Sequence, residues 1–360
     1  MMKYLNCRNL VLPFAVMLLL SSCAKNPSES QQDNELRILN ATQQVYFPNA
    51  VPMNGDGSLW LISHSRTGTG DRVDSGNHVA IDYTGRVLPG MGGQIFQTTD
   101  ANTARQLGTF ARNAHFAPIF TPTEPMQVAL HTALSEMRVG DTVKMMSASW
   151  LAFGAQSFER WHGEVSLPAN TPIVFEVVLH EIAPNPSERE LNIVKNYVDS
   201  VNELHPAFFV QAQDHEGNPL PGFYISYANT VPLHDTASYA VEGSRMEVKY
   251  AGFYVQTGFL LDSNIDSITQ RGWGMAPAST NDFTFTFTST GESSEAINAM
   301  SLALRNVAPG SWVEAVFTSD YGYGANGYLR AATNQRITDR PIHPYTPLRF
   351  KIFFVGHSTD

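Results

Sequence analysis

Several residues of this chain belong to types that carry enzyme chemistry, but few have the spacing that a known mechanism requires. Gly322, Gly324 and Gly327 match a dinucleotide-binding loop literally, yet no βαβ unit surrounds them and no helix is expected to follow. His180-Glu181 lacks the second histidine of a zinc-protease motif, and the eleven histidines are scattered without a ligand cluster. The chain also contains no G-x-S-x-G nucleophile motif and no P-loop. The sequence therefore predicts neither a cofactor nor a metal site.

The charge and cysteine content exclude further classes of protein. Acidic residues number 33 against 23 basic ones, for a net charge of −10, and this argues against a nucleic-acid partner, which needs a basic face. Cys7 and Cys23 are the only cysteines, so a disulfide framework is excluded. The 26 glycines and 21 prolines fit a turn-rich, strand-heavy protein, and a length of 360 residues suggests two domains.

The N-terminus has the features of an export signal. Lys3 and Arg8 precede an apolar run, Leu10–Leu20, that is too short to span a bilayer. The following Leu20-Ser21-Ser22-Cys23 resembles the bacterial lipobox, which implies that residues 1–22 are removed and that Cys23 is lipidated. An ordinary secretory signal with a chance cysteine is the alternative. Residues 23–34 are polar, and we expect them to tether a folded body to the membrane.

Two later segments share one layout, and this indicates an internal repeat. Tyr83 and Tyr250 are 167 residues apart, Gly154 and Gly324 are 170 apart, and Phe175 and Phe350 are 175 apart. Each segment contains a strand-like block, a helix-like block, an aromatic-glycine block and a final strand, at 78–85, 129–141, 150–155 and 171–182 in the first, and at 245–252, 296–310, 320–325 and 346–356 in the second. We expect domains at 35–186 and 187–360.

The periodicity of each segment predicts an α+β fold. The strand-like blocks alternate apolar and polar residues, whereas the helix-like blocks carry apolar stripes, for example Ile297, Met300 and Leu304. We expect each domain to be an antiparallel sheet curved around one short helix. A linking helix is predicted at about 187–204, with Ser187 and Glu190 at capping-box spacing.

Taken together, these segments resemble FKBP-type peptidyl-prolyl isomerase domains. The family pattern includes a strand ending in Tyr-Thr-Gly, a Gly-x-x-Phe-Asp-Ser element, a helix closing on a Val-Gly turn, Asp-Tyr-x-Tyr-Gly, and a final strand around Leu-Val-Phe. The strongest matches are HVAIDYTG (78–85) and SEMRVGD (135–141) in the first segment, and DYGYGA (320–325) and TPLRF (346–350) in the second. The resemblance covers roughly residues 79–182 and 246–355.

The resemblance implies a prolyl pocket in each domain. In the second, catalytic roles would fall to Tyr250, Asp262, Tyr323 and Phe350, and substrate contacts to Leu261, Ile297 and Met300. The family usually has phenylalanine where Leu261 stands and tryptophan where Met300 stands, whereas Asp262 and Tyr323 match. The corresponding set in the first domain is Tyr83, Phe96, Gln97, Gln127, Leu130, Phe153 and Phe175.

The first domain departs further from the family in its polar positions. Gln97 replaces the aspartate, Leu130 the tryptophan of the pocket floor, and Phe153 the hydrogen-bonding tyrosine, whereas Phe96 and Phe175 match. We therefore expect any activity to reside in the second domain. Judged without the resemblance, Phe175 and Phe350 are as consistent with plain core residues, and Asp262 with an Asx-turn.

The resemblance implies an isomerase of X-Pro bonds in exported proteins, without a cofactor. Its partners would be unfolded or proline-containing polypeptides, and its place the bacterial cell envelope, anchored through Cys23 and facing the periplasm or the cell surface. Two alternatives remain open. The chain is a catalytically weak or inactive chaperone that keeps the apolar cleft, or it is a structural lipoprotein that uses the fold as a scaffold.

Overall fold

The computed structural model describes residues 27–156, 158–161, 165–232, 239–292, 295–328 and 340–358. The predicted signal peptide, residues 1–22, and the predicted lipidation site, Cys23, lie outside the described residues. Within the described ranges, no helix is both long enough and apolar enough to cross a bilayer.

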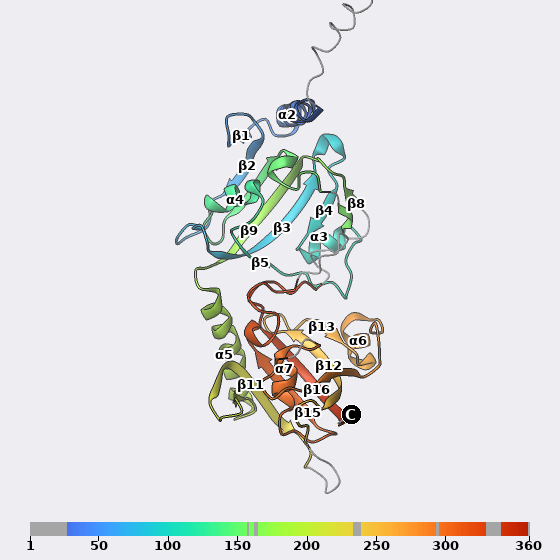
Figure 1. Ribbon diagram of the computed structural model, residues 1–360. Coiled ribbons are helices and arrows are strands. Elements are labelled where there is room, and N and C mark those ends of the chain that lie inside the picture. The colour runs from blue at the N-terminus through green and yellow to red at the C-terminus, as the bar shows by residue number, and fades with distance from the viewer. Residues whose placement is uncertain are drawn as a thin grey trace, which may run out of the picture.

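The strands assemble into two antiparallel sheets of the same order, as the sequence repeat predicts (Figure 1). The first sheet runs β1-β2-β6-β9-β3-β4, with β5 paired to β3. Its strands are β1 (Val51–Pro52), β2 (Leu59–Ser65), β3 (His78–Val87), β4 (Ile95–Thr98), β5 (Ile119–Pro122), β6 (Thr142–Ser147) and β9 (Ile173–Ala183). A separate hairpin pairs β7 (Phe158–Trp161) with β8 (Val165–Leu167).

The second sheet runs β10-β11-β15-β16-β12-β13, with β14 paired to β12. Its strands are β10 (Val210–Gln213), β11 (Pro219–Asn229), β12 (Arg245–Tyr254), β13 (Leu260–Ser263), β14 (Phe283–Thr286), β15 (Trp312–Phe317) and β16 (Leu348–Ser358). The final strand of each repeat, β9 or β16, lies at the centre of its sheet between β6 and β3 or between β15 and β12. The predicted mixed α+β class with antiparallel sheets is confirmed.

The helices occur at corresponding places in the two repeats. The described residues contain α2 (Pro27–Tyr46), α3 (Ala101–Gln106) and α4 (Val128–Ser135) with the first sheet, and α5 (Pro186–Leu204), α6 (Asp266–Trp273) and α7 (Asn298–Leu304) with the second. The sequence analysis expects one short helix within each repeat, α4 or α7. It misses α3 and α6, which are short and mostly polar. It also assigns residues 23–34 to a tether, whereas α2 begins within that segment, at Pro27.

The linking helix α5 differs from its prediction at its first turn. Asn185, not Ser187, is the N-cap, and its side-chain oxygen accepts a hydrogen bond from the backbone N–H of Glu188. Glu190 is not part of a capping box, because its carboxylate is buried and turns toward Ser319. Val194 and Val198 form the buried stripe of the helix and pack against Phe209 and Val316.

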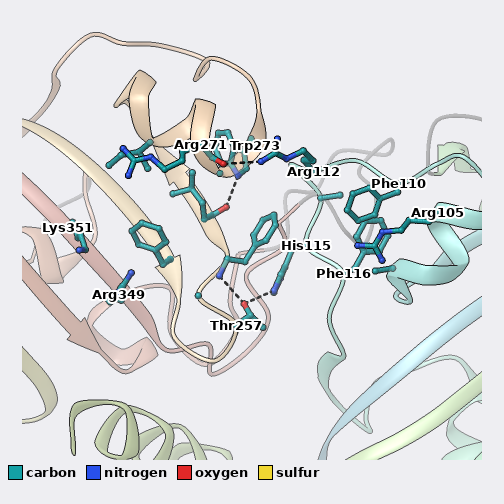
Figure 2. Close-up of a pocket in the computed structure, with 18 residues that line it drawn as sticks. Arg105, Phe110, Arg112, His115, Phe116, Thr257, Arg271, Trp273, Arg349 and Lys351 are labelled. Atoms are coloured by element: carbon teal, nitrogen blue, oxygen red, sulfur yellow. Dashed lines mark hydrogen bonds between the residues drawn. The ribbon is translucent and has the colours of Figure 1, made fainter. Parts of the chain in front are cut away.

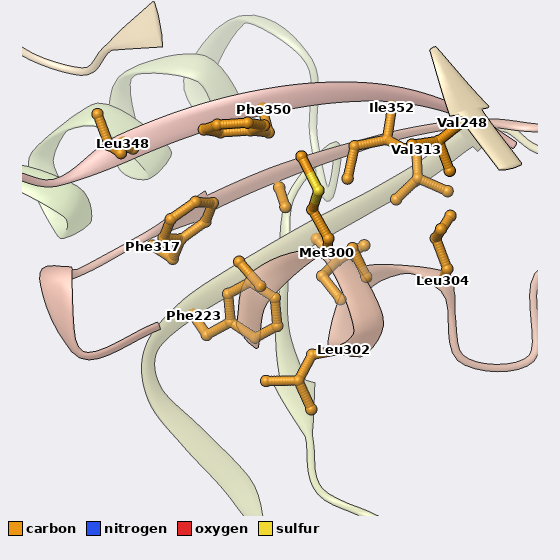
Figure 3. Close-up of a cluster of buried hydrophobic side chains, with 14 of the residues drawn as sticks. Phe223, Val248, Met300, Leu302, Leu304, Val313, Phe317, Leu348, Phe350 and Ile352 are labelled. Carbon is orange, nitrogen blue, oxygen red and sulfur yellow. The ribbon is translucent and has the colours of Figure 1, made fainter. Parts of the chain in front are cut away.

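The core of the second domain lies between α7 and the concave face of its sheet. Met300, Leu302 and Leu304 project from α7 toward aromatic and branched residues of the strands, among them Phe223, Phe317, Phe350 and Ile352 (Figure 3). Leu304, Phe223 and Phe317 are completely buried. The corresponding core of the first domain contains Leu134, Met145, Phe175 and Val177. Each core lies next to a cavity that is open at one end of the helix.

Candidate functional site

A cavity of about 570 Å³ opens between the sheet and α7 in the second domain. It is lined by all seven residues that the resemblance assigns to the second pocket: Tyr250, Leu261, Asp262, Ile297, Met300, Tyr323 and Phe350. Strands β12, β13 and β16 carry Tyr250, Leu261, Asp262 and Phe350, whereas the other three come from the start of α7 and the turn after β15. The fold therefore brings together residues that lie up to 100 positions apart in the sequence.

A hydrogen bond joins the two polar groups on the sheet side of this cavity. The hydroxyl of Tyr250 donates to Oδ2 of Asp262 at 2.7 Å. Burial, followed by the charge of Asp262 and this hydrogen bond, raises the pKa of Tyr250 well above its ordinary value. The hydroxyl consequently stays protonated and fixes the orientation of the exposed carboxylate at the cavity rim.

The aromatic wall of the cavity depends on a glycine. The ring of Phe350 lies 6.0 Å from that of Tyr250, nearly parallel to it, and 5.8 Å from that of Phe317. A Cβ at Gly252 would stand 2.7 Å from Cζ of Phe350, closer than packed atoms approach. Gly252 thus allows the ring to lie directly against the backbone of β12. Gly85, at the matching position of the first domain, also allows a ring to approach the backbone, but that ring belongs to Phe96: a Cβ would meet Phe96 and the hydroxyl oxygen of Tyr83.

The turn that carries Tyr323 is held by a buried carboxylate of the linking helix. Glu190 accepts hydrogen bonds from the backbone N–H and the hydroxyl of Ser319, both at 2.9 Å. Burial raises the pKa of Glu190, and the two bonds from Ser319 only partly oppose that rise. The backbone carbonyl of Ser319 in turn accepts hydrogen bonds from the N–H groups of Gly322 and Gly324, both at 2.8 Å, on either side of Tyr323. Glu190 is therefore a positioning residue, a role that its capping-box spacing to Ser187 does not indicate.

The first domain repeats this arrangement in detail. Glu35, on α2, accepts from the backbone N–H and the hydroxyl of Ser149, both at 2.8 Å. Ser149 accepts from Gly154 at 2.7 Å, beside Phe153. We call each pair, Glu35 with Ser149 and Glu190 with Ser319, a glutamate clamp. The only sequence signal for either clamp is that a glutamate occurs in each leading helix and that a serine directly precedes each aromatic-glycine block. These two signals are more than 100 residues apart, so neither indicates the other.

The cavity of the first domain measures about 520 Å³, and its wall is more apolar than that of the cavity in the second domain. Six of its seven assigned residues line it, namely Tyr83, Gln97, Gln127, Leu130, Phe153 and Phe175. Phe96 does not, because it is completely buried behind the wall, where its ring meets that of Phe153 edge to face at 5.8 Å. No carboxylate lines this cavity in the described part of the chain. Burial alone raises the pKa of Tyr83.

Both cavities also contain residues that the sequence analysis does not assign. Phe283, Glu295 and Tyr328 also line the second cavity, and the ring of Tyr328 is tilted against that of Tyr323 with 5.6 Å between ring centroids. Glu295 forms a two-oxygen ion pair with Arg245 at 2.7–2.9 Å. Ile119, Met126 and Gln156 line the first cavity. Phe283 and Ile119 open the short strands β14 and β5, whereas the others lie in irregular connections, and no family motif marks any of them.

Groups of acidic, histidine or cysteine side chains that could hold a metal ion do not occur among the described residues. No family model matches the chain. No curated protein matches its sequence.

Solved structures resemble parts of the chain weakly. The three FKBP domains of wheat FKBP73 align at 13% identity with a TM-score of 0.29, over 87% of this chain and 100% of that one. A peptidyl-prolyl cis-trans isomerase from Pseudomonas syringae aligns at 19% identity with a TM-score of 0.32, over 45% and 99%. FkpA from Escherichia coli aligns at 15% identity with a TM-score of 0.29, over 48% and 71%. At these values the three structures do not by themselves indicate a function for this chain.

Proposed function

We propose that this chain is an FKBP-type peptidyl-prolyl cis-trans isomerase whose active site is the cavity of the second domain. The observation that carries the proposal is the convergence of Tyr250, Asp262, Tyr323 and Phe350 around one opening, above an apolar floor formed by Met300. The sequence motifs that resemble the family thus supply neighbouring parts of a single cavity. We propose the polypeptide substrate to be an exported protein, and its reacting group to be the bond before a proline.

The reaction needs only that the rotating bond be bound better when it is twisted than when it is planar. Loss of amide resonance makes a barrier of about 18–20 kcal/mol, and uncatalysed X-Pro exchange takes about 10–100 s. The twisted amide has less charge separation than the planar one, so a dry aromatic cavity favours it. Phe350, Met300 and Leu261 supply apolar contact for the prolyl ring, and no nucleophile is required.

Polar groups at the rim would hold the peptide while the bond turns. The hydroxyl of Tyr323 and a backbone N–H near Ile297 are the proposed donors to substrate carbonyls. Asp262 is oriented by Tyr250 at 2.7 Å, and we propose that its carboxylate holds the twisted amide or its neighbouring groups in place. Each such hydrogen bond would contribute about 0.5–1.5 kcal/mol, or up to about tenfold in rate, if it forms more strongly in the transition state.

The test is an exchange assay with a proline-containing tetrapeptide and the chain lacking residues 1–22. Tyr323→Phe and Asp262→Ala should each lower kcat/KM by about threefold to tenfold. Phe153→Ala, which opens the wall of the first cavity, serves as the matched control and should leave the rate within about twofold, because a lone apolar contact in an inactive cavity adds nothing to the transition state. If all variants have the wild-type rate, or if the wild-type chain shows no rate above buffer, the proposed active site is wrong.

A chaperone without catalysis is the second candidate. The missing floor tryptophan, replaced by Met300 and Leu130, and the missing carboxylate in the first cavity favour it. In that case the full chain would suppress aggregation of an unfolding client while leaving peptide exchange at the buffer rate. Suppression that disappears in Phe153→Ala would locate client binding in the first domain.

The place of the protein in the cell is also a proposal. We propose that residues 1–22 are removed, that Cys23 is acylated, and that domains at 35–186 and 187–360 face the periplasm or the cell surface of a bacterium. Metabolic labelling with a palmitate analogue tests this directly. Label should appear on the wild-type chain and be absent from Cys23→Ser, and label on both would exclude the lipid anchor.

A further inference from the structure

A third cavity, of about 750 Å³, lies between the two domains (Figure 2). One side is formed by α3 and the segment that follows it, residues 105–116, from the first domain. The other side is formed by the end of β12, the loop into β13, α6 and β16 of the second domain. His115 fixes the junction, because its ring stacks 4.1 Å from that of Tyr254 and its Nε2 is 3.0 Å from the hydroxyl of Thr257.

This interdomain cleft is separate from the proposed prolyl cavity. Successive residues of a strand point to opposite faces of the sheet. On β16, Phe350 faces the prolyl cavity, whereas Arg349 and Lys351 line the interdomain cleft. On β13, Leu261 faces the prolyl cavity and Leu260 the cleft. The two sites therefore use the two faces of one sheet, and a ligand in the cleft would not touch the prolyl site.

The cleft gathers positive charge in a chain whose net charge is −10. It is lined by five basic side chains, Arg105, Arg112, Arg271, Arg349 and Lys351, and by no carboxylate in the described ranges. Arg349 and Lys351 share Glu314, at 3.4 and 3.2 Å. The structure as described shows no ion pair for the three other arginines, and Arg112 instead donates to the backbone oxygen of Arg271 at 3.1 Å.

Aromatic rings stand between these charges. Phe110 and Phe116 stack at 5.4 Å, with the guanidinium of Arg105 over the ring of Phe110 at 4.3 Å. Phe253 and Trp273 line the opposite side, and Arg349 lies 4.6 Å above the ring of Phe253. Planar guanidinium groups bind phosphate and carboxylate through paired N–H donors, and the rings offer a flat apolar surface beside them.

We propose that the interdomain cleft binds a small organic anion, in which a phosphate or carboxylate group is attached to an aromatic or acyl body. The arginines that line the two sides of the cleft would attract the anionic group, and the body would lie against the aromatic rings. The volume falls within the range of about 300–1,000 Å³ that is usual for small-molecule sites. An extended polyanion is disfavoured, because the acidic remainder of the chain would repel it outside the cleft.

Titration calorimetry with three probes tests the proposal on the chain lacking residues 1–22. 1-Naphthyl phosphate should bind saturably, and more tightly than either inorganic phosphate or 1-naphthol, because only the ester satisfies both the arginines and the rings. Its affinity should fall as sodium chloride is raised from about 0.05 to 0.5 M, since screening weakens exposed charge pairs. Equal affinity for 1-naphthol, for inorganic phosphate, or at both salt concentrations overturns the proposal.

Variants locate the binding. Arg105→Gln combined with Arg271→Gln should weaken binding of 1-naphthyl phosphate by roughly fivefold to tenfold, because it removes one positive charge from each side of the cleft. Arg37→Gln, on the exposed face of α2, removes the same charge elsewhere and should change nothing. Tyr323→Phe should also leave the affinity unchanged, so that failure of the isomerase proposal and failure of this one are distinguishable. Equal weakening by Arg37→Gln would exclude the cleft.

Discussion

Gly252 shows how a single residue shapes the proposed active site. Its missing side chain is the reason that Phe350 reaches the backbone of β12, and Phe350 is 3% exposed, against Tyr250 and Phe317. The first domain has Gly85 at the matching position of its strand. Both glycines end the strand motif Tyr-x-Gly, so that motif encodes a close approach of a ring rather than a turn.

Gly252→Ala should destabilise the second domain and lower its activity. The new methyl group would overlap the ring of Phe350 in a packed core, at a cost of about 1–3 kcal/mol in the free energy of unfolding. Urea unfolding measures this cost, and the exchange assay measures the activity. Gly356→Ala is the matched control on β16, because nothing lies within 4 Å of the added Cβ. A similar loss of stability in both variants would show that ring contact is not the cause.

At the scale of elements, each domain uses its leading helix to hold a turn at the mouth of its cavity. Glu35 on α2 and Glu190 on α5 make the same two hydrogen bonds, to Ser149 and Ser319. A helix that packs on the outside of the sheet thereby controls where Phe153 or Tyr323 stands.

Glu190→Ala should act on the second cavity alone. The buried N–H and hydroxyl of Ser319 would lose their acceptor, which costs about 1–3 kcal/mol in stability and displaces Tyr323. At temperatures well below the melting temperature, we expect Glu190→Ala to have a lower kcat/KM than the wild type. Glu190→Gln, which keeps one acceptor oxygen, should recover part of that loss. Glu35→Ala makes the identical change in the first domain and should spare the exchange rate. A loss of rate in Glu35→Ala equal to that in Glu190→Ala would contradict this assignment.

The elements also show which parts of the structure can be predicted from local pattern. An apolar stripe at helical spacing predicts the linking helix at about 187–204, and the helix is found at Pro186–Leu204. The seven assigned residues of the second cavity follow from motifs that keep their order. Glu190 was misassigned as a capping residue, because a buried carboxylate and a capping one look alike in sequence. The segment 105–116 has no motif at all, since its partners lie in the other domain.

At the scale of the whole molecule, the two domains are joined by contacts between aromatic side chains, most of them partly buried, as well as by α5. The ring of His115 of the first domain stacks on those of Tyr254 and Phe259 of the second, and Tyr345 of the second domain lies 5.2 Å from the ring of His78. Burial lowers the pKa of His115 to about 4, and burial together with the charge of His115 lowers that of His343 to about 4.

Acid should therefore weaken the junction between the domains. Because the folded pKa of His115 lies below the ordinary value of about 6.5, its contribution is complete above pH 6.5 and is lost as the pH falls toward 4. We expect about 2 kcal/mol of stability to be lost between pH 7 and pH 5 through this group. Urea unfolding measures the loss, and small-angle X-ray scattering should show a larger radius of gyration at pH 5.

His115→Phe keeps a ring against Tyr254 and Phe259 but cannot take up a proton. The variant should lose less stability than the wild type between pH 7 and pH 5. His215→Phe, at an exposed turn, should follow the wild-type profile. If all three proteins respond to acid alike, another group governs the junction.

The paired glutamate clamps have a consequence for how this chain can be divided. In each clamp the acceptor lies at the beginning of a repeat and the donors lie near its end. A fragment that keeps the clamp must therefore include the leading helix. A fragment that starts at Pro184 carries the partner that Ser319 requires, whereas one that starts at Phe208 leaves that serine orphaned inside the protein.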